Sequence, residues 1–356
     1  MLSTMMDIPL SLTRILEYGA SVHGSTTVTT WHGEGTGSEF DPAEEVTFRD
    51  IAARAAAFAH AIHDDLGITG DERVGSFMWN CAEHLEVMFG TACKGAIFAP
   101  LNKQLMNDQI RHIINHAEIS AIVCDPRLAQ QLGKVLVGTD SVKSVIITGA
   151  QPAQQFAHLF PRGIEVYSYE ALIDGRSTVY DWPELDERTA AALCYSTGTT
   201  GAPKGVLYSH RSLYLEAMQL RSSDSLCITH GETFLCCIPI CHVLSWGVPF
   251  TCFMTGTPLV LPDADVSAPT LAKAIAATSP RVAHGVPTIW IQLFVHYMHH
   301  PPERMTLTEI YAGGSPVPPT LIKMWEERYG VDVVHVWGMV ETSTVGSVAR
   351  PCLLYT

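Results

Sequence analysis

The chain has 356 residues, of which 47% are hydrophobic and 16% are charged, so it can bury a large core in two or three lobes. Lysine and arginine number 22 against 36 acidic residues, which gives a net charge of -14. This balance disfavours nucleic acid and anionic lipid as partners, because both carry negative charge. Small molecules are therefore the favoured partners.

The N-terminal segment MLSTMMDIPLSL has no basic region before its apolar residues, and it contains Asp7. It therefore does not read as a secretion signal, and we expect a cytoplasmic location. Ten cysteines are scattered through the chain without a regular spacing. This usage is typical of reduced, mostly buried thiols, so we predict no disulfides.

In chain order, a short helix precedes two predicted strands, Thr26–Trp31 and Val46–Phe48, which form a hairpin around HGEGTGSE. That turn misses the dinucleotide-binding pattern, because Ser38 stands where the third glycine belongs and no helix follows directly. Thr47 and Asp50 make a capping box that starts a helix. The apolar stripe of this helix, which predicts packing on a sheet, contains Ile51, Ala55, Phe58, Ala59 and Ile62.

Two series of apolar runs of strand length follow, separated by segments of helix length. The first series is RVGSFMW, IFAPL, SAIVCD and SVIITG, with the helix NDQIRHIINHAE between them. The second is TFLCCIPI, PLVLP, RVAHGVP, LTEIYAGG and VDVVHVWG, with the helices PTLAKAIAATS and PPTLIKMWEERYG. This alternation predicts an α/β fold with two doubly wound, mainly parallel sheets and a cleft between them.

The segment from Leu235 to Pro262 contains no acid, lysine or arginine and is long enough to span a bilayer. Its prolines and glycines divide it into strand, helix and strand lengths. We therefore expect a buried part of the α/β core and no membrane span.

The stretch YSTGTTGAPKG, which starts at Tyr195, combines hydroxyls, glycines and one lysine. It is not a P-loop, because Gly205 follows Lys204 where that motif needs Ser or Thr. The flanking runs AALCYS and GVLYS predict two strands with Thr197–Lys204 as a mobile turn between them. Glycines let backbone N–H groups approach phosphate oxygens, hydroxyls donate, and the lysine supplies charge. We interpret the turn as polyphosphate-binding, with a plain surface hairpin as the alternative.

This string resembles the phosphate-binding motif of the adenylate-forming superfamily, which contains acyl-CoA synthetases, luciferases and peptide-synthetase adenylation domains. IPICHVLSWGVPF, AGGSPVPPTL and HVWGMVETS follow in the family's order between Ser11 and Arg350. WNCAEHLEVMFG and GVPTIW look closest to medium- and long-chain fatty acyl-CoA ligases. The resemblance implies activation of a fatty acid by ATP and Mg²⁺ to acyl-AMP, followed by transfer of the acyl group to CoA.

The resemblance also implies the family's N-terminal domain over residues 11–350, with subdomains near 70–225 and 11–69 plus 226–350. Three features that the family places downstream cannot be matched: an Asp for the ribose hydroxyls, a hinge, and a C-terminal cap domain with a catalytic lysine. We therefore expect a truncated chain with little turnover and a tendency to aggregate. The last residues, CLLYT, can be encoded by TGTCTCTTATACACA, which resembles a transposon-end adaptor; a genuine tail is the alternative. A homodimer is left open.

By the same resemblance, Lys204 neutralises the departing pyrophosphate, and Glu341 holds Mg²⁺ with Ser196 as a second contact. A solvated surface charge is the alternative for Glu341. The family usually has Thr where this chain has Val340, so a hydrogen bond worth about 1 kcal/mol is lost there. The other expected nucleotide contacts are Thr197, Gly198, Thr199, Thr200 and Gly201 in the loop, and Gly313, Gly314, Ser315, Trp337 and Gly338 elsewhere, with Trp337 stacked on adenine.

On the acid side, the resemblance places His242 beside the substrate carboxylate and Trp246 at the gate of an acyl tunnel; core packing is the alternative for both. Zinc at Cys236, Cys237, Cys241 and His242 is disfavoured, because the spacing does not match and no second ligand pair follows. ICHVLSWGVPF has no acidic residue to pair with an ammonium group, so an alkyl or aryl acid fits best.

Three rival functions stay open. One is a ligase branch for aryl or other short acids. The second is an inactive fragment that binds only nucleotide or a protein partner. A P-loop NTPase is the third, and Gly205 disfavours it.

Overall fold

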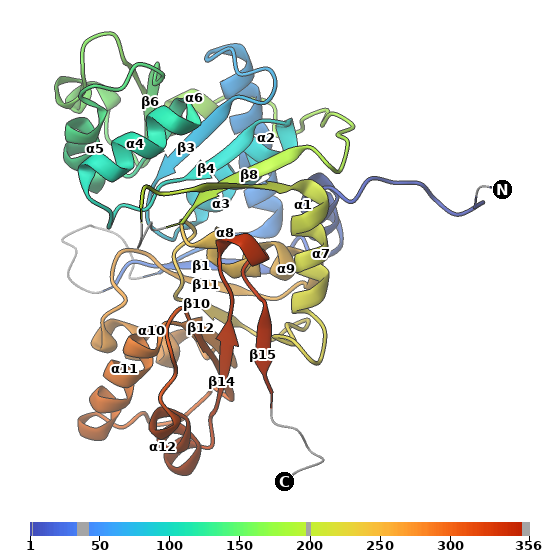
Figure 1. Cartoon of the computed structure of the whole chain (residues 1–356), viewed down its shortest axis with the longest axis vertical. Helices are drawn as coiled ribbons and strands as arrows, with labels where there is room; N and C mark the ends of the chain where they lie inside the picture. Colours follow the sequence, from blue (N-terminus) through green and yellow to red (C-terminus); the bar gives the residue numbers. More distant parts are fainter. Residues whose placement is uncertain (2, 34–42, 197–200, 351–356) are drawn as a thin grey trace.

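The computed structural model describes residues 1–356 except 2, 34–42, 197–200 and 351–356. Its described strands form two mainly parallel sheets, one above the other in Figure 1, with helices between them and on their outer faces. We call them the upper and the lower sheet. This architecture confirms the predicted α/β fold class with two sheets.

The upper sheet joins seven described strands in the order β7-β6-β5-β3-β4-β8-β9. Neighbours are parallel except β8 and β9, an antiparallel hairpin with Tyr195 opposite Gly205. Its strands are β3 (Arg73–Phe77), β4 (Ile97–Pro100), β5 (Ile119–Cys124), β6 (Ser144–Ile147), β7 (Glu165–Ser168), β8 (Ala190–Tyr195) and β9 (Gly205–Ser209). The predicted first series and the hairpin are confirmed. The sequence analysis missed β7, because its residues EVYS are partly exposed and do not form an apolar run like those of β4 and β6.

The lower sheet joins eight described strands in the order β15-β14-β13-β12-β10-β11-β1-β2, and its antiparallel edge pairs are β1 with β2 and β14 with β15. Its strands are β1 (Thr27–Trp31), β2 (Ala43–Thr47), β10 (Phe234–Cys236), β11 (Leu259–Pro262), β12 (Val282–Gly285), β13 (Glu309–Gly313), β14 (Asp332–Trp337) and β15 (Ser347–Ala349). The second predicted series is confirmed. The predicted strand Val46–Phe48 is wrong at its end, because Thr47 caps a helix that already includes Phe48.

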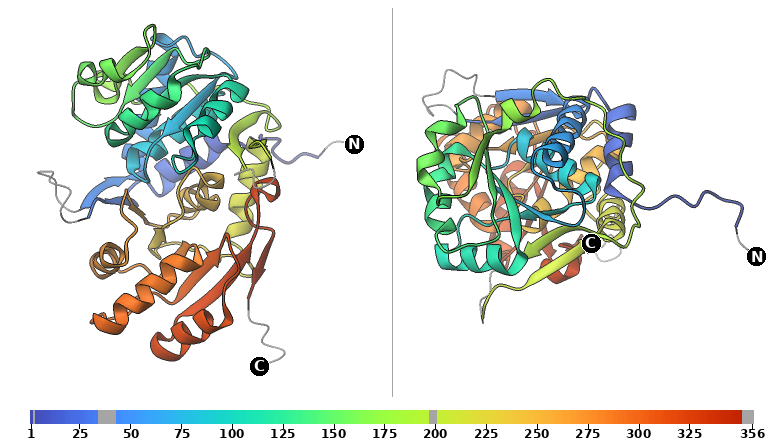
Figure 2. Two further views of the ribbon diagram at one scale, coloured as in Figure 1. Left: turned by 60° about the vertical axis from the view of Figure 1, so that its left-hand side comes forward. Right: turned by 90° about the horizontal axis from the view of Figure 1, so that it is seen from above.

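Three layers of helices cover the sheets, as the views in Figure 2 show. Between the sheets lie α1 (Leu12–Val22), α2 (Phe48–Asp64), α3 (Ala82–Lys94), α7 (His210–Leu220) and α9 (Val248–Thr255), with α6 (Tyr169–Ile173) against α2. The upper sheet is covered on its other face by α4 (Asn107–Ala117) and α5 (Ala129–Leu136). The lower sheet is covered by α10 (Ala268–Thr278), α11 (Pro287–His299) and α12 (Pro319–Tyr329).

The central layer is held by aromatic packing that begins at the predicted capping box. The hydroxyl of Thr47 accepts from the Asp50 backbone N–H at 3.2 Å, and the Asp50 carboxylate accepts from the Thr47 N–H at 2.9 Å. The next residue, Phe48, stacks on Phe253 of α9 at 3.9 Å between ring centroids, and Phe89 of α3 lies 4.7 Å from the same ring. The predicted apolar stripe of α2 is fully buried. The centre of the molecule is thus a helical layer clamped between two sheets.

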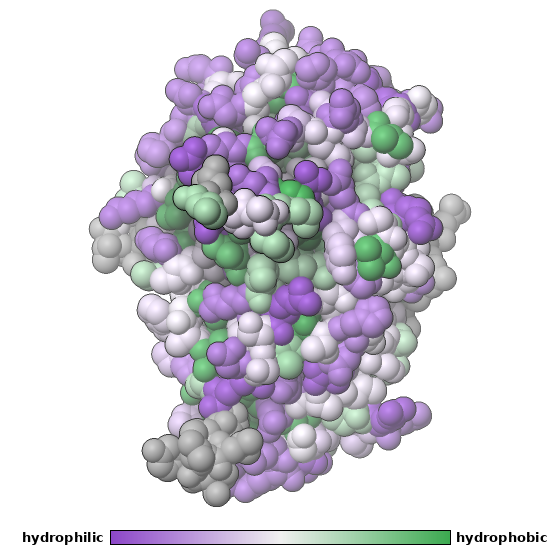
Figure 3. All heavy atoms as spheres, turned by 90° about the vertical axis from the view of Figure 1, so that its right-hand side faces the viewer, coloured by the Kyte–Doolittle hydropathy of each residue, from purple (hydrophilic) through white to green (hydrophobic). Residues whose placement is uncertain are grey.

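The apolar segment from Leu235 to Pro262 is part of this core, divided into β10, two helical pieces and β11 as expected. Across the part of the chain that the structure describes, no helix has both the length and the apolar character to cross a membrane. The nine cysteines in that part are free thiols. On the face shown in Figure 3, hydrophobic side chains gather midway between the sheets, and hydrophilic ones dominate the top and bottom.

Candidate active site

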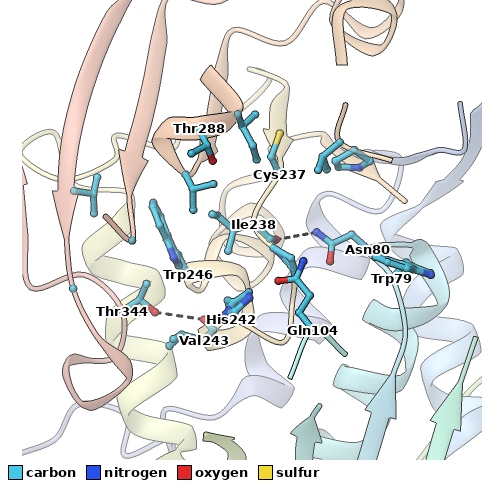
Figure 4. A pocket seen from close by; sticks show the side chains of 18 of the residues that line it. Trp79, Asn80, Gln104, Cys237, Ile238, His242, Val243, Trp246, Thr288 and Thr344 are labelled. Carbon is cyan, nitrogen blue, oxygen red and sulfur yellow. Dashed lines mark hydrogen bonds between the residues drawn. The ribbon is translucent and has the colours of Figure 1, made fainter. Parts of the chain in front are cut away.

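A cavity of about 690 Å³ opens where the parallel strands of the lower sheet end. Its wall includes residues that directly follow β10, β11, β12, β13 and β14, and also Trp79 and Asn80, which follow β3 of the upper sheet. The carboxyl ends of parallel strands are the usual ligand sites of open α/β sheets. Figure 4 shows Trp246 and Ile238 in the middle of this cavity, between Thr344 and Asn80. The predicted cleft is therefore present.

One wall is a tight turn, α8 (Val243–Trp246), whose backbone is left-handed. All four residues have φ between 48° and 58°, and Gly247 follows at φ 70°. Left-handed helical backbone costs residues with a Cβ about 1–2 kcal/mol each, and it is especially unusual for a β-branched residue such as Val243. The sequence analysis predicted a helix length within the segment from Leu235 to Pro262 and did not predict a left-handed turn there.

Two residues that the sequence predicted for the acid side lie at the two ends of this turn. His242 caps it, and Trp246 is its last residue, with the indole only 7% exposed; both residues line the cavity. Burial lowers the pKa of His242, and the positive charge of Lys103 lowers it further. The imidazole is therefore neutral near pH 7, where it can act as one donor and one acceptor.

Asn80 ties the loop after β3 to the end of β10, and the sequence analysis did not single it out. Its amide donates to the carbonyl of Ile238 at 2.8 Å (Figure 4). The amide also donates to the carbonyl of Cys236 at 3.3 Å, and its oxygen accepts from the Ile240 N–H at 3.0 Å. These hydrogen bonds occupy the Ile238 carbonyl and the Ile240 N–H, which would pair with a neighbouring strand if β10 continued. This explains why β10 is shorter than the predicted run TFLCCIPI. Asn80 thus joins the two sheets at the cavity.

Glycines shape the opposite wall, which the resemblance assigns to the nucleotide. A Cβ at Gly313 would lie 2.4 Å from the Val336 carbonyl oxygen and 2.9 Å from the Trp246 ring. Gly314 has φ +81°, and a Cβ at Gly338 would overlap the Thr344 carbonyl. Gly314 and Gly338 line the cavity, and Gly313 lies directly behind Trp246. Ser315 follows β13 on the exposed surface.

Trp337 ends β14 and stands at the rim. Its side chain is 53% exposed, and its ring lies so close to Gly346 that a Cβ there would be 2.5 Å from a ring carbon. An exposed aromatic face held by backbone on one side can accept a stacked base on the other. Trp337 does not line the cavity itself, but Gly338 next to it does.

The β8–β9 hairpin contacts the segment that carries Glu341 through Tyr208. The Tyr208 hydroxyl of β9 donates to the Val340 carbonyl in η4 (Val340–Thr342), and Ser196 and Lys204 pair at the base of the loop through Ser196 N–H to Lys204 O at 3.0 Å and Lys204 N–H to Ser196 Oγ at 3.2 Å. The side chains of Lys204 and Glu341 are exposed. The predicted contacts Thr197, Gly198, Thr199 and Thr200 lie outside the described residues, and Gly201 lies on the exposed turn after them.

The donor set around Glu341 is compatible with Mg²⁺. Among the described residues, no group of three or more His, Cys, Asp or Glu side chains could hold a metal by itself. Mg²⁺ commonly keeps several waters and takes one or two carboxylates together with substrate phosphates. The single exposed carboxylate of Glu341 fits that coordination. Of the cysteines considered above as zinc ligands, Cys236 places its Sγ atom 3.0 Å from the Ser245 hydroxyl, whereas Cys237 lines the cavity. The two neighbouring thiols therefore face different surroundings.

Two further residues next to the turn were missed because they carry no motif. Glu216 of α7 is 4% exposed, a Cβ on Gly247 would lie 2.9 Å from its carboxyl carbon, and neither of its oxygens has a hydrogen-bond partner in the part of the chain described. Lys103 is buried with its ammonium 3.1 Å from the Met78 carbonyl and 4.0 Å from the centre of the Trp79 ring. Only burial and long-range packing identify them.

Comparison with known proteins agrees with this geometry. The family model "AMP-binding enzyme" matches residues 18–354. The chain is 33% identical over 351 residues to a 3-methylmercaptopropionyl-CoA ligase of Ruegeria lacuscaerulensis, covering 99% of this chain and 63% of that protein. It is 32% identical over 354 residues to a medium-chain-fatty-acid–CoA ligase of Ectopseudomonas oleovorans, covering 99% of this chain and 62% of that protein.

In fold, the chain is similar to the solved structure of a long-chain-fatty-acid-CoA ligase from Archaeoglobus fulgidus, with a TM-score of 0.81, 22% identity, and coverage of 99% of this chain and 70% of that one. This chain covers 63% and 62% of the two ligases from Ruegeria lacuscaerulensis and Ectopseudomonas oleovorans, which is less than two thirds of the length of each. The match of the family model over nearly the whole chain and the similarity to these ligases lead to one conclusion: the chain belongs to the family of AMP-binding enzymes.

Proposed function

We propose that this chain forms the ATP- and acid-binding part of an AMP-forming fatty acyl-CoA ligase. The observation that carries the proposal is the continuity of the cavity, in which one wall is apolar and includes Trp246 and Ile289, and the other is the glycine-rich edge at Gly314 and Gly338. An acyl chain and a nucleotide can therefore meet in one space. The acyl side suits an apolar tail, because ligand sites of this kind are mostly apolar with few polar groups.

In the proposed reaction, a carboxylate oxygen of the acid bonds to the α-phosphorus of ATP as the bond to pyrophosphate breaks. The CoA sulfur then bonds to the acyl carbon, and AMP leaves. Lys204 neutralises charge on the departing pyrophosphate, and Glu341 with Ser196 holds the Mg²⁺ that shields the phosphates. Neutral His242 orients the carboxylate, and Trp337 stacks on the adenine.

The acid is proposed to be an alkyl carboxylic acid. The stretch Ile240–Phe250 has no acidic side chain that could pair with an amino group, and its cavity-lining members include Val243 and Trp246. The names of two relatives, a 3-methylmercaptopropionyl-CoA ligase and a medium-chain-fatty-acid–CoA ligase, favour open-chain acids over aryl acids. A cytoplasmic location remains part of this proposal.

Two measurements on the 356-residue chain test the proposal. Calorimetric titration with AMP, and with a sulfamoyl analogue of decanoyl adenylate, is expected to show binding that is tighter for the analogue, because the analogue fills both halves of the cavity. Pyrophosphate release, which we expect to be small for this chain, is then measured with ATP, Mg²⁺ and butanoate, octanoate, palmitate or benzoate, with Lys204→Ala as the control that loses it. Release that does not depend on the added acid contradicts the proposal, and AMP binding without any turnover favours the nucleotide-binding fragment.

A further inference from the structure

The left-handed turn Val243–Trp246 is held by contacts that centre on Ser245. The Ser245 hydroxyl donates to the Ile238 carbonyl at 2.6 Å, and the Nε2 atom of His284 donates to the Ser245 carbonyl at 3.1 Å. Ser245 and His284 have no solvent exposure. Strained backbone persists only where its surroundings over-determine it, and these two hydrogen bonds fall on the middle of the turn.

His284 lies in β12, 39 residues along the chain from Ser245. Its ring also contacts the indole of Trp246. The ring stands edge-on to Trp246 with 5.2 Å between centroids and makes a similar contact with Phe234 on its other side. Burial lowers the pKa of His284 to about 4, so the ring is neutral near pH 7. Its Nδ1 atom has no partner among the described residues, and the donated hydrogen therefore sits on Nε2.

We propose that His284 is a positioning residue of the acid-binding half: it keeps Val243–Trp246 left-handed and thereby sets the Trp246 indole and His242 in the cavity wall. His284 is not among the described residues that line the cavity, so it acts through the turn and not on a ligand. The functional part of this inference rests on the proposed function, because it takes the cavity as the site of the acyl group. The conformational part, which concerns only the backbone of Val243–Trp246, does not depend on the proposed function.

The conformational part is tested by comparing the melting temperatures of a glycine and an alanine variant at Val243. Glycine is favoured over alanine at a left-handed residue and disfavoured elsewhere. Val243→Gly is therefore expected to melt about 2 °C above Val243→Ala in the parent chain. His284→Phe keeps an aromatic ring but removes the donor, and in that background the order is expected to reverse. His284→Gln keeps an amide N–H near the Nε2 position and is expected to restore the parent order.

The same glycine-over-alanine order in all three backgrounds would overturn the proposal, because the turn would then be left-handed without His284. Phe234→Leu is the matched control: it removes the other aromatic neighbour of His284 and is expected to leave the order as in the parent. These melting experiments need no ligand, so they remain decisive if the variants bind nothing.

The functional part is tested by titrating AMP and the sulfamoyl analogue of decanoyl adenylate into His284→Phe and His284→Gln. Loss of the turn is expected to weaken the analogue about tenfold or more in His284→Phe, because it displaces the acyl wall, while AMP affinity stays within about twofold. His284→Gln is expected to recover most of the loss. An equal loss for AMP and analogue, or no loss at all, would overturn the positioning role. Absence of AMP binding in the parent would instead count against the proposed function.

Discussion

The two halves of the site are built differently, and one tryptophan in each half shows how. Trp246 on the proposed acid side is 7% exposed and contacts His284, while Trp337 on the proposed nucleotide side is 53% exposed and rests on Gly346. The charged side chains divide in the same way. Glu216 and Lys103 are buried near the acid half, whereas Glu341 and Lys204 of the nucleotide half are exposed.

On the proposed function, this difference means that the core preorganises the acid half, whereas ligand binding completes the nucleotide half. The buried wall of the acid half keeps its shape although it contains strained backbone at Val243–Trp246 and, at Glu216, carboxylate oxygens that are unpaired among the described residues. Exposed charges keep their water until phosphates and Mg²⁺ replace it, so they add little to the stability of the free chain. Substitutions in the acid half should therefore change stability, and those in the nucleotide half should change ligand affinity.

The largest expected effect comes from the two tryptophans. Trp246→Ala is expected to lower the free energy of unfolding by about 3–5 kcal/mol, because it leaves a cavity in the core. Trp337→Ala is expected to lower it by less than about 1 kcal/mol, because that ring is half exposed. Denaturant unfolding of both variants checks the pair, and AMP titration is expected to show the opposite order. Equal losses of stability would remove the distinction between the halves.

The glutamates give the next effect, which depends on pH. Burial raises the pKa of Glu216 to about 8 from an ordinary value of 4.5. The stability that this carboxyl contributes is thus fully present below pH 4.5 and is lost as pH rises through about 8. Glu216→Gln is expected to be nearly neutral at pH 5 and to stabilise the chain by roughly 3 kcal/mol at pH 8.5.

Of the described groups that face Glu216, the Thr344 side chain lowers the pKa of this carboxyl, but burial outweighs it, and no cation is among them. Cys194 and Tyr208 are acidic when they titrate, and the negative charge of Glu216 raises the pKa of each. Urea unfolding at the two pH values measures the effect, with Glu341→Gln as the exposed control that shows no such pH dependence. A Glu216→Gln variant that gains equally at both pH values would mean that folding does not raise the pKa of this carboxyl.

Two lysine substitutions are expected to have smaller effects than those above. Substitution of Lys103 should change mainly the stability of the chain, and substitution of Lys204 mainly its affinity for the nucleotide. Lys103→Met removes a hydrogen bond to Met78 and a cation–π contact with Trp79, and it is expected to cost about 1–2 kcal/mol of unfolding free energy. Lys204→Ala is expected to leave stability within about 0.5 kcal/mol and to weaken binding of ATP with Mg²⁺ about tenfold. Thermal unfolding and calorimetry distinguish the two. Unchanged ATP binding in Lys204→Ala would contradict its proposed role.

The smallest effect is expected at Val340, which lines the cavity beside Glu341. Val340→Thr adds a hydroxyl on the nucleotide side and is expected to strengthen AMP binding by about 1 kcal/mol at most. The same change at Val286, which lines the cavity on another strand end, is the control and is expected to have no such effect. A weaker affinity in Val340→Thr would show that the valine packs against the nucleotide.

Much of the scaffold could be predicted because its signals are local. The alternation of apolar runs predicted both sheets, the Thr47–Asp50 pair predicted the start of α2, and the alternating runs around YSTGTTGAPKG predicted the β8–β9 hairpin. Each of these signals lies within a few neighbouring residues, where period, capping and turn chemistry act. The motif strings predicted the family for the same reason, since each string keeps its residues together along the chain.

Only the tertiary structure decided the details of the cavity. Asn80 binds the carbonyl of Ile238 across 158 positions, and His284 binds Ser245 across 39, so no window of sequence contains both partners. Local preference favours right-handed backbone at Val243–Trp246 and an exposed carboxylate at Glu216, and long-range packing overrides both. The sequence by itself determined the sheets, the hairpin and the family, because those depend on neighbours in the chain. The hand of the turn and the burial of Glu216 depend on neighbours in space, which only the folded chain brings together.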